Sequence, residues 1–179
     1  SWQQRRMLNQ YLFHNLLEQA RAAQRVTAVI VVGRDTQIMA DVGWDQVHFE
    51  QEEKHSLNGA LEQARQRALA NQADAILILP TDLPLVTSGD IRQLYEWGKT
   101  QPTMVIAPSH DGGTNALLLH PPQTIPFAFG PQSFARHCTL AEEAELSYQI
   151  LASPSLSFDL DWPKDLAQLS VVNPEWAIA

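Results

Sequence analysis

The chain has 179 residues, of which 45% are hydrophobic and 18% charged, and its formal net charge is −8. This composition is typical of one globular domain, and no apolar run reaches the ~20 residues that a membrane-spanning helix needs. The acidic balance argues against DNA or RNA as a partner, because nucleic-acid binding draws on Lys and Arg side chains. The single cysteine, Cys138, cannot form an internal disulfide, so we expect a cytoplasmic protein.

Helical and strand patterns alternate along the chain. The expected elements are a helix over 2–24, a buried strand over 26–32, a short helix over 36–41, a weak strand over 47–49, a helix over 57–68 capped by Ser56, a strand over 75–79, a helix opened by the capping box 87–90, and strands over 104–108 and 116–119. This order predicts an α/β fold with a mostly parallel central sheet flanked by helices.

Asp82 follows the strand expected over 75–79 and lies between Pro80 and Pro84. In parallel sheets that helices cover, ligands bind beyond the carboxyl ends of the strands. The two prolines end the strand and stiffen the loop, so we expect Asp82 at the rim of an active site. The alternative is a turn aspartate that accepts backbone hydrogen bonds.

Asp159 and Asp161 lie two positions apart in a segment that reads as extended. In extended backbone, residues two apart point to the same side, so both carboxylates can share one cation. Magnesium prefers such hard oxygen ligands together with substrate phosphates. As an alternative, Asp161 caps a helix that Pro163 opens.

Two loops of the second half are rich in residues that expose backbone amides. The loop over 109–115 contains Gly112 and Gly113, and such amides can cradle a phosphate or a carboxylate, although a plain hairpin or crossover turn explains the glycines equally well. In the second loop we expect Gly130 to end an apolar strand and Pro131 to open a helix. Ser133 then lies at a helix N-terminus that favours anions, or simply caps it.

Four motifs occur together, namely 79–85, 112–117, 127–134 and 159–166. In this combination and order the chain resembles the 2-phospho-L-lactate guanylyltransferase family, including its phosphoenolpyruvate and 3-phosphoglycerate variants, which acts in coenzyme F-420 biosynthesis. The resemblance implies a Rossmann-like, glycosyltransferase-A-type nucleotidyltransferase. Such an enzyme transfers GMP from GTP to a small phosphorylated acid and releases pyrophosphate.

The resemblance also implies roles for individual residues. They are Asp82, Asp159 and Asp161 as catalytic ligands of Mg²⁺, Thr114, Asn115, Gly130 and Ser133 as ligands of the acid, and Leu57, Asn58 and Pro80 as neighbours of the nucleotide. Members of the family begin with a strand and a basic loop that this chain lacks. We therefore expect residues 1–179 to be one nucleotidyltransferase domain without the first strand and signature loop. Either the sequence is trimmed, which we favour because loss of a central strand would leave a gap in the sheet, or the polypeptide lacks part of its GTP site.

Rival functions are a related sugar or molybdopterin nucleotidyltransferase, a glycosyltransferase, and a non-catalytic nucleotide-binding module. The compact loop from Gly130 to Ser133 favours a small acid over a sugar or a pterin. The expected partners are small molecules, with no membrane, and a symmetric homodimer is the default expectation.

Overall fold

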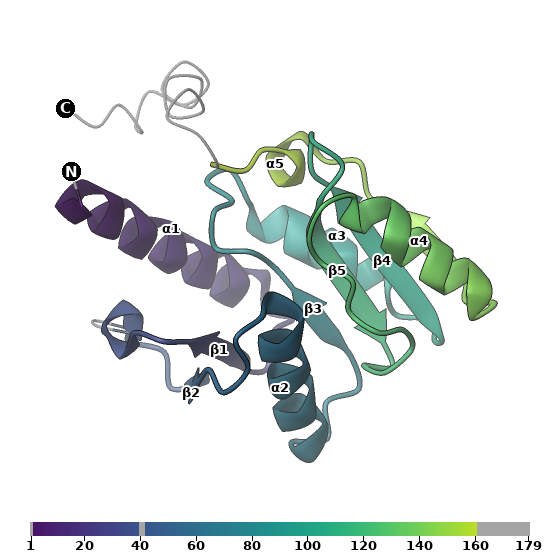
Figure 1. Cartoon of the computed structure of the whole chain (residues 1–179), viewed down its shortest axis with the longest axis horizontal. Helices are drawn as coiled ribbons and strands as arrows, with labels where there is room; N and C mark the ends of the chain where they lie inside the picture. Colours follow the sequence, from purple (N-terminus) through teal and green to yellow (C-terminus); the bar gives the residue numbers. More distant parts are fainter. Residues whose placement is uncertain (1, 40–41, 161–179) are drawn as a thin grey trace.

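The computed structural model describes residues 2–39 and 42–160 (Figure 1). Its helices are α1 (Trp2–Ala23), the 3-10 helix η1 (Thr36–Met39), α2 (Leu57–Ala70), α3 (Ser88–Trp97), α4 (Ser133–Glu143) and α5 (Pro154–Ser157). Its strands are β1 (Val29–Gly33), β2 (Val47–Gln51), β3 (Ile76–Ile78), β4 (Thr103–Pro108), β5 (Thr114–His120) and β6 (Tyr148–Ile150). The alternation of helices and strands confirms the predicted α/β fold.

The strands form two sheets. β1 and β2 pair in parallel, and the other four lie in the order β3-β5-β4-β6. β5 is antiparallel to both of its neighbours, whereas β4 and β6 are parallel. Strands β3, β4 and β6 therefore run in one direction and only β5 opposes them, so this sheet is mostly parallel, as predicted.

Helices cover both faces of the four-stranded sheet (Figure 1). Val105 of β4 faces a core that includes residues of α1 and α3, whereas its neighbours Met104 and Ile106 face a core with residues of α4. This alternation follows from the two-residue period of a strand. A strand that is apolar on both faces is thus explained by packing on two sides.

The predicted helix starts are confirmed. Ser56 Oγ accepts a hydrogen bond from the Gly59 amide at the start of α2, over 3.2 Å. Thr87 and Asp90 form a reciprocal capping box at the start of α3. α2 packs against β1, and α1 packs against α3. Within the described residues, no helix combines the length and the apolar character needed to cross a bilayer.

Several predicted elements differ in the structure. β1 and β3 are half-buried and not fully buried, because each pairs with a strand on only one edge within the described residues. The apolar segment 126–129 is not a strand, and side chains take the place of strand partners there. Residues 154–157, ahead of Asp159, form the short helix α5 and not the extended segment that we expected, whereas Phe158 next to Asp159 has an extended backbone. The expectation of a further strand ahead of this chain stays a prediction.

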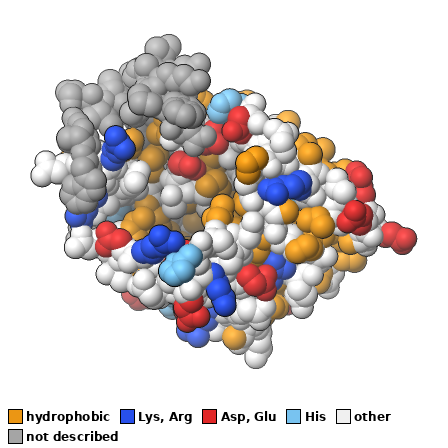
Figure 2. Space-filling model, viewed as in Figure 1, with side chains coloured by type: hydrophobic (Ala, Val, Ile, Leu, Met, Phe, Trp, Pro, Cys, Tyr) orange, Lys and Arg blue, Asp and Glu red, His pale blue; other side chains and the backbone are white. Residues whose placement is uncertain are grey.

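Charged side chains of both signs are interspersed over the face that Figure 2 shows.

Candidate active site

Asp82 lies in the loop that follows β3. Its neighbour Leu83 is fully buried and Val86 is 3% exposed, and both pack in the core that includes residues of α1 and α3. Two buried anchors therefore fix the backbone on the C-terminal side of the carboxylate. Asp82 itself remains half-buried, which keeps it within reach of solvent.

Asp159 belongs to a segment that runs along the Asp82 loop. The Leu160 amide donates to the Asp82 carbonyl over 3.0 Å. Phe158 and Leu160, which flank Asp159, pack in the same apolar cluster as Leu85. The two segments that contain Asp82 and Asp159 are thus joined by a backbone hydrogen bond and by packing.

The start of α5 is tied to the capping box of α3, which fixes the segment leading to Asp159. Ser153 Oγ and Ser155 Oγ each donate to the Asp90 carboxylate over 2.7 Å. Burial alone would raise the pKa of Asp90, but hydrogen bonds from Thr87, Ser153 and Ser155 outweigh it, and the pKa is lowered. A charged Asp90 is therefore the native form over the whole neutral range.

The loop between β4 and β5, residues 109–113, also contacts this segment. The His110 amide donates to the Ser157 carbonyl over 3.1 Å, and His110 Nδ1 lies 3.1 Å from Asp159 Oδ1. Because β4 and β5 are adjacent and antiparallel, this loop is a hairpin connection, which was the simpler of the two alternatives. The hairpin loop nevertheless takes part in the site, since it borders both Asp159 and the hollow described next.

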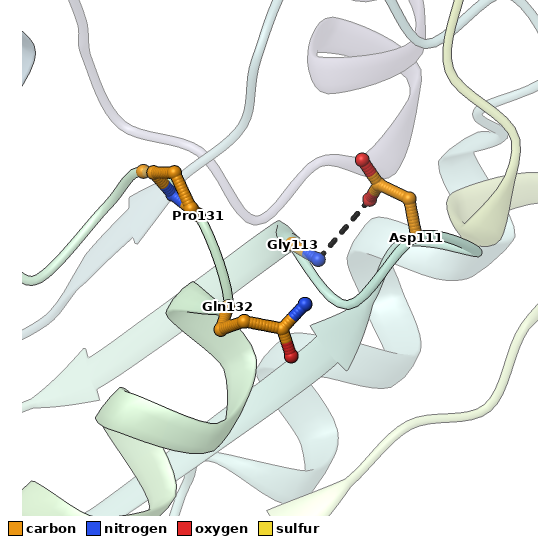
Figure 3. A pocket seen from close by; sticks show the side chains of 5 residues that line it. Asp111, Gly113, Pro131 and Gln132 are labelled. Carbon is orange, nitrogen blue, oxygen red and sulfur yellow. Dashed lines mark hydrogen bonds between the residues drawn. The ribbon is translucent and has the colours of Figure 1, made fainter.

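A hollow of about 360 Å³ lies between the hairpin loop and the start of α4. Its lining residues are Asp111, Gly113, Gly130, Pro131 and Gln132. In Figure 3 Gln132 extends toward the hairpin loop, and Asp111 accepts a hydrogen bond from the Gly113 amide over 3.1 Å. Ser109 also donates to Asp111, and this hydroxyl and the Gly113 amide lower the pKa of the Asp111 carboxyl.

The two glycine loops meet at the start of α4. The Phe134 amide donates to the Gly112 carbonyl over 3.3 Å. Gly112 and Gly130 have φ of +91° and +121°, which explains glycine at both positions. The N-cap of α4 is Gln132, in a left-handed conformation and with no side-chain cap bond. Pro131 therefore does not open the helix, and Ser133 is its first residue and not its cap.

Thr114 and Ser133 were both predicted to hold the acid, and the structure brings them together. Ser133 Oγ donates to Thr114 Oγ1 over 3.0 Å. Both residues are buried, at 6% and 1% exposure, and each is next in sequence to a residue that lines the hollow. The residue pair thus links β5 to α4 next to residues of that lining.

Sequence reasoning missed two residues of α4. Arg136 lies one turn after Ser133, and its Nη2 is 3.2 Å from the position that a Cβ atom of Gly130 would occupy. His137 is fully buried, lies 3.1 Å from Thr114 Oγ1 through Nδ1, and accepts from the Ala128 amide through Nε2. Arg136 and His137 follow Ser133 by three and four residues, so they lie on the same face of the helix. This spacing could have indicated both residues from the sequence.

Other predicted site residues have different surroundings. Asn115 is buried and donates to the Leu156 carbonyl over 2.9 Å, so it holds α5. Asn58 binds the backbone of Phe129. Leu57 is exposed at the start of α2, and Pro80 is half-buried two residues after the end of β3.

Asp82 and Asp159 suit a magnesium ion, which takes one or two carboxylates and completes its shell with water and substrate phosphates. Within the described residues, no three His, Cys, Asp or Glu side chains are grouped closely enough to hold a metal by themselves. Asp161 lies outside the described residues, so the three-aspartate site stays a prediction.

The fold of this chain is also found in a solved structure. The structure is similar to that of a solved 4-diphosphocytidyl-2C-methyl-D-erythritol synthase, with a TM-score of 0.68 at 13% identity over 90% of this chain and 89% of the other. At this identity the likeness concerns the fold alone.

The chain belongs to the family described as "Guanylyl transferase CofC like", whose sequence model matches residues 2–173. It is 41% identical to the phosphoenolpyruvate guanylyltransferase of Rubrobacter xylanophilus, over 79% of this chain and 69% of that protein. It is 33% identical to the 3-phospho-D-glycerate guanylyltransferase of Colwellia psychrerythraea, over 68% of this chain and 58% of that protein. The family resemblance drawn from the motifs is thereby confirmed.

Proposed function

We propose that this protein transfers GMP from GTP to a small phosphorylated carboxylic acid and releases pyrophosphate, as a step in coenzyme F-420 biosynthesis. The observation that carries the proposal is the hydrogen bond from the Leu160 amide to the Asp82 carbonyl, which sets the backbone of the Asp159 segment against the Asp82 loop. The hairpin loop then joins Asp159 to the hollow at the start of α4.

In the proposed reaction, a phosphate oxygen of the acid attacks the α-phosphorus of GTP. A new P–O–P linkage forms, the bond between the α-phosphorus and the bridging oxygen breaks, and pyrophosphate leaves with that oxygen. Asp82 and Asp159 would hold Mg²⁺, which neutralises phosphate charge when it is bound. The protein contributes positioning, so no side-chain nucleophile is needed.

The hollow is the proposed site of the acid. The start of α4 supplies a helix N-terminus, and Arg136 supplies a cation beside Gly130. A volume of about 360 Å³ suits a small acid. We propose phosphoenolpyruvate as this acid, because the Rubrobacter xylanophilus relative carries that name and is more similar to this chain than the Colwellia psychrerythraea relative.

The test is pyrophosphate release from GTP and Mg²⁺ with phosphoenolpyruvate, 3-phosphoglycerate and 2-phospho-L-lactate offered in parallel, with ATP as a nucleotide control. We expect release with GTP and phosphoenolpyruvate. Release with another of the acids would correct the substrate, and no release with any of them from folded protein would reject the function.

A pair of variants sharpens this test. Asp82→Asn removes a ligand charge at the carboxyl end of β3, and we expect turnover to fall by at least ~100-fold with little change in stability. Asp74→Asn makes the same chemical change at an exposed position before the same strand and should leave turnover unaltered. Normal turnover in Asp82→Asn would contradict the magnesium assignment.

A further inference from the structure

His137 is held from three sides inside the protein. It has no exposed surface, and its ring packs edge-on against Phe129 with the ring centroids 4.9 Å apart. One ring nitrogen contacts the Thr114 hydroxyl and the other contacts the Ala128 amide. The ring therefore connects the segment before Gly130 to the first residue of β5.

These contacts fix the protonation of the ring. A backbone N–H can only donate, so His137 Nε2, which lies 3.0 Å from the Ala128 nitrogen, must accept and carries no proton. The proton of the neutral ring is then on Nδ1, which donates to Thr114 Oγ1 over 3.1 Å. Burial and the nearby Arg136 charge lower the pKa of His137 to about 4 against a weaker contribution from the Ser133 carbonyl, so the ring is neutral at pH 7.

The Thr114 hydroxyl oxygen consequently accepts two hydrogen bonds, one from His137 Nδ1 and one from Ser133 Oγ. A hydroxyl has two acceptor positions and one proton to donate. With both acceptor positions filled, the only remaining capacity of the Thr114 hydroxyl is as a donor. No hydrogen bond from this hydroxyl to another acceptor occurs among the residues that the structure describes.

We propose that His137 is a positioning residue that turns the Thr114 hydroxyl into an obligate donor toward the anionic group of the acid. This inference rests on the proposed function, because it takes the hollow beside Gly113 and Gln132 as the acid site. A negatively charged oxygen only accepts hydrogen bonds, and it accepts them more strongly than a neutral oxygen does, so a hydroxyl left with its donor alone favours an anionic ligand. Ser133 supports Thr114 and acts on the acid through it.

Two substitutions of His137 separate its two contacts. The side-chain amide of Asn can reach the place of Nδ1, so His137→Asn keeps a donor for Thr114 and loses the acceptor for Ala128. His137→Gln can place its carbonyl near Nε2, keeps that acceptor and loses the donor. We expect His137→Gln to raise the KM for phosphoenolpyruvate roughly ten- to a hundredfold with the KM for GTP unchanged. His137→Asn should raise it less than tenfold.

Substitutions of the two hydroxyl residues test whether Ser133 acts through Thr114, without changing the His137 ring. Thr114→Val should raise the KM for phosphoenolpyruvate more than Ser133→Ala does, if the Thr114 hydroxyl is the donor to the acid and Ser133 acts through it as proposed. His120→Gln is the control, because His120 is a partly buried histidine that contacts the Gly98 carbonyl in another part of the protein. Circular dichroism and thermal unfolding identify any variant that does not fold.

Equal KM values in His137→Gln and His137→Asn, both folded, would overturn the positioning role, and so would a larger effect of Ser133→Ala than of Thr114→Val. Calorimetric titration of phosphoenolpyruvate into each protein without GTP separates this inference from the proposed function. If the wild-type protein binds this acid but does not turn it over, the proposed function is wrong. The affinities of the variants for phosphoenolpyruvate then still test the positioning role of His137. If wild-type protein binds no phosphoenolpyruvate, the inference is wrong.

Discussion

Asn58 of α2 binds the backbone of Phe129 through both ends of its side-chain amide. Nδ2 donates to the Phe129 carbonyl over 3.1 Å, and Oδ1 accepts from the Phe129 amide over 2.8 Å. The amide thus pairs with the segment before Gly130 as a neighbouring strand would. We propose that Asn58, which the family resemblance assigns to the nucleotide, supports the proposed acid site through this segment.

Asn58→Asp tests this reassignment. The change removes the donor and places a negative charge against the Phe129 carbonyl, so we expect a loss of about 1–3 kcal/mol in the free energy of unfolding. The KM for the acid should rise several-fold while the KM for GTP stays within twofold. Gln66→Glu makes the same chemical change on the exposed part of α2 and serves as the control. A selective rise in the KM for GTP would restore the nucleotide role.

Arg65 provides a second support from α2. It is 5% exposed, donates to the Ile125 carbonyl over 2.9 Å, and its guanidinium carbon lies 3.8 Å from the ring centroid of Phe127. Arg65→Met should lower the free energy of unfolding by about 2–4 kcal/mol, because it leaves a buried carbonyl without its donor. Arg67→Met, at an exposed ion pair with Glu50, should change it by less than about 1 kcal/mol in urea unfolding.

Arg136 lies beside Gly130, with its Nη2 3.2 Å from the place that a Cβ atom of Gly130 would occupy. We expect Arg136→Gln to raise the KM for phosphoenolpyruvate about tenfold at low ionic strength, and the difference from wild type to shrink as salt screens the exposed charge. Steady-state kinetics at low and at high salt give the KM for phosphoenolpyruvate of both proteins and its dependence on salt. Arg92→Gln removes an exposed arginine from α3 and is the matched control. An effect that is independent of salt would argue for a packing role.

The buried neutral ring of His137 makes stability depend on pH. Its pKa is lowered from 6.5 to about 4, so between these pH values the unfolded state binds a proton that the folded state does not. The free energy of unfolding should therefore fall as the pH drops from 6.5 to 4, by at most about 3 kcal/mol from this group. Urea unfolding of wild type and of His137→Asn over this range measures the difference. Identical pH slopes in the two proteins would contradict the assignment.

Local signals in the sequence predicted local structure well. The capping residues Ser56 and Thr87 start their helices as expected, because caps depend on atoms within three residues. Asp82 is found in a loop after its strand because the adjacent prolines and the apolar run are themselves local. The motif order then indicated the family, which no single motif could do.

Long-range pairing explains what the sequence could not predict. The residues 126–129 have the apolar character of a strand, but their backbone partners are the side chains of Asn58 and His137, which hydrophobic periodicity cannot foresee. The segment before Asp159 forms the turn of helix α5 because Ser153 and Ser155 bind Asp90, some 60 residues earlier. These contacts are set by the packing of distant elements and not by any neighbouring residue.

The hairpin loop touches Asp159 on one side and the start of α4 on the other, and this limits how the protein can evolve. The Ser109 amide donates to the Gly113 carbonyl over 3.0 Å, and a Cβ atom on Gly113 would lie 2.7 Å from Ser109 Oγ. An inserted residue would displace both halves of the site at once. New acid preferences should therefore arise by exchanging side chains around the hollow, such as Gln132, within a loop of constant length.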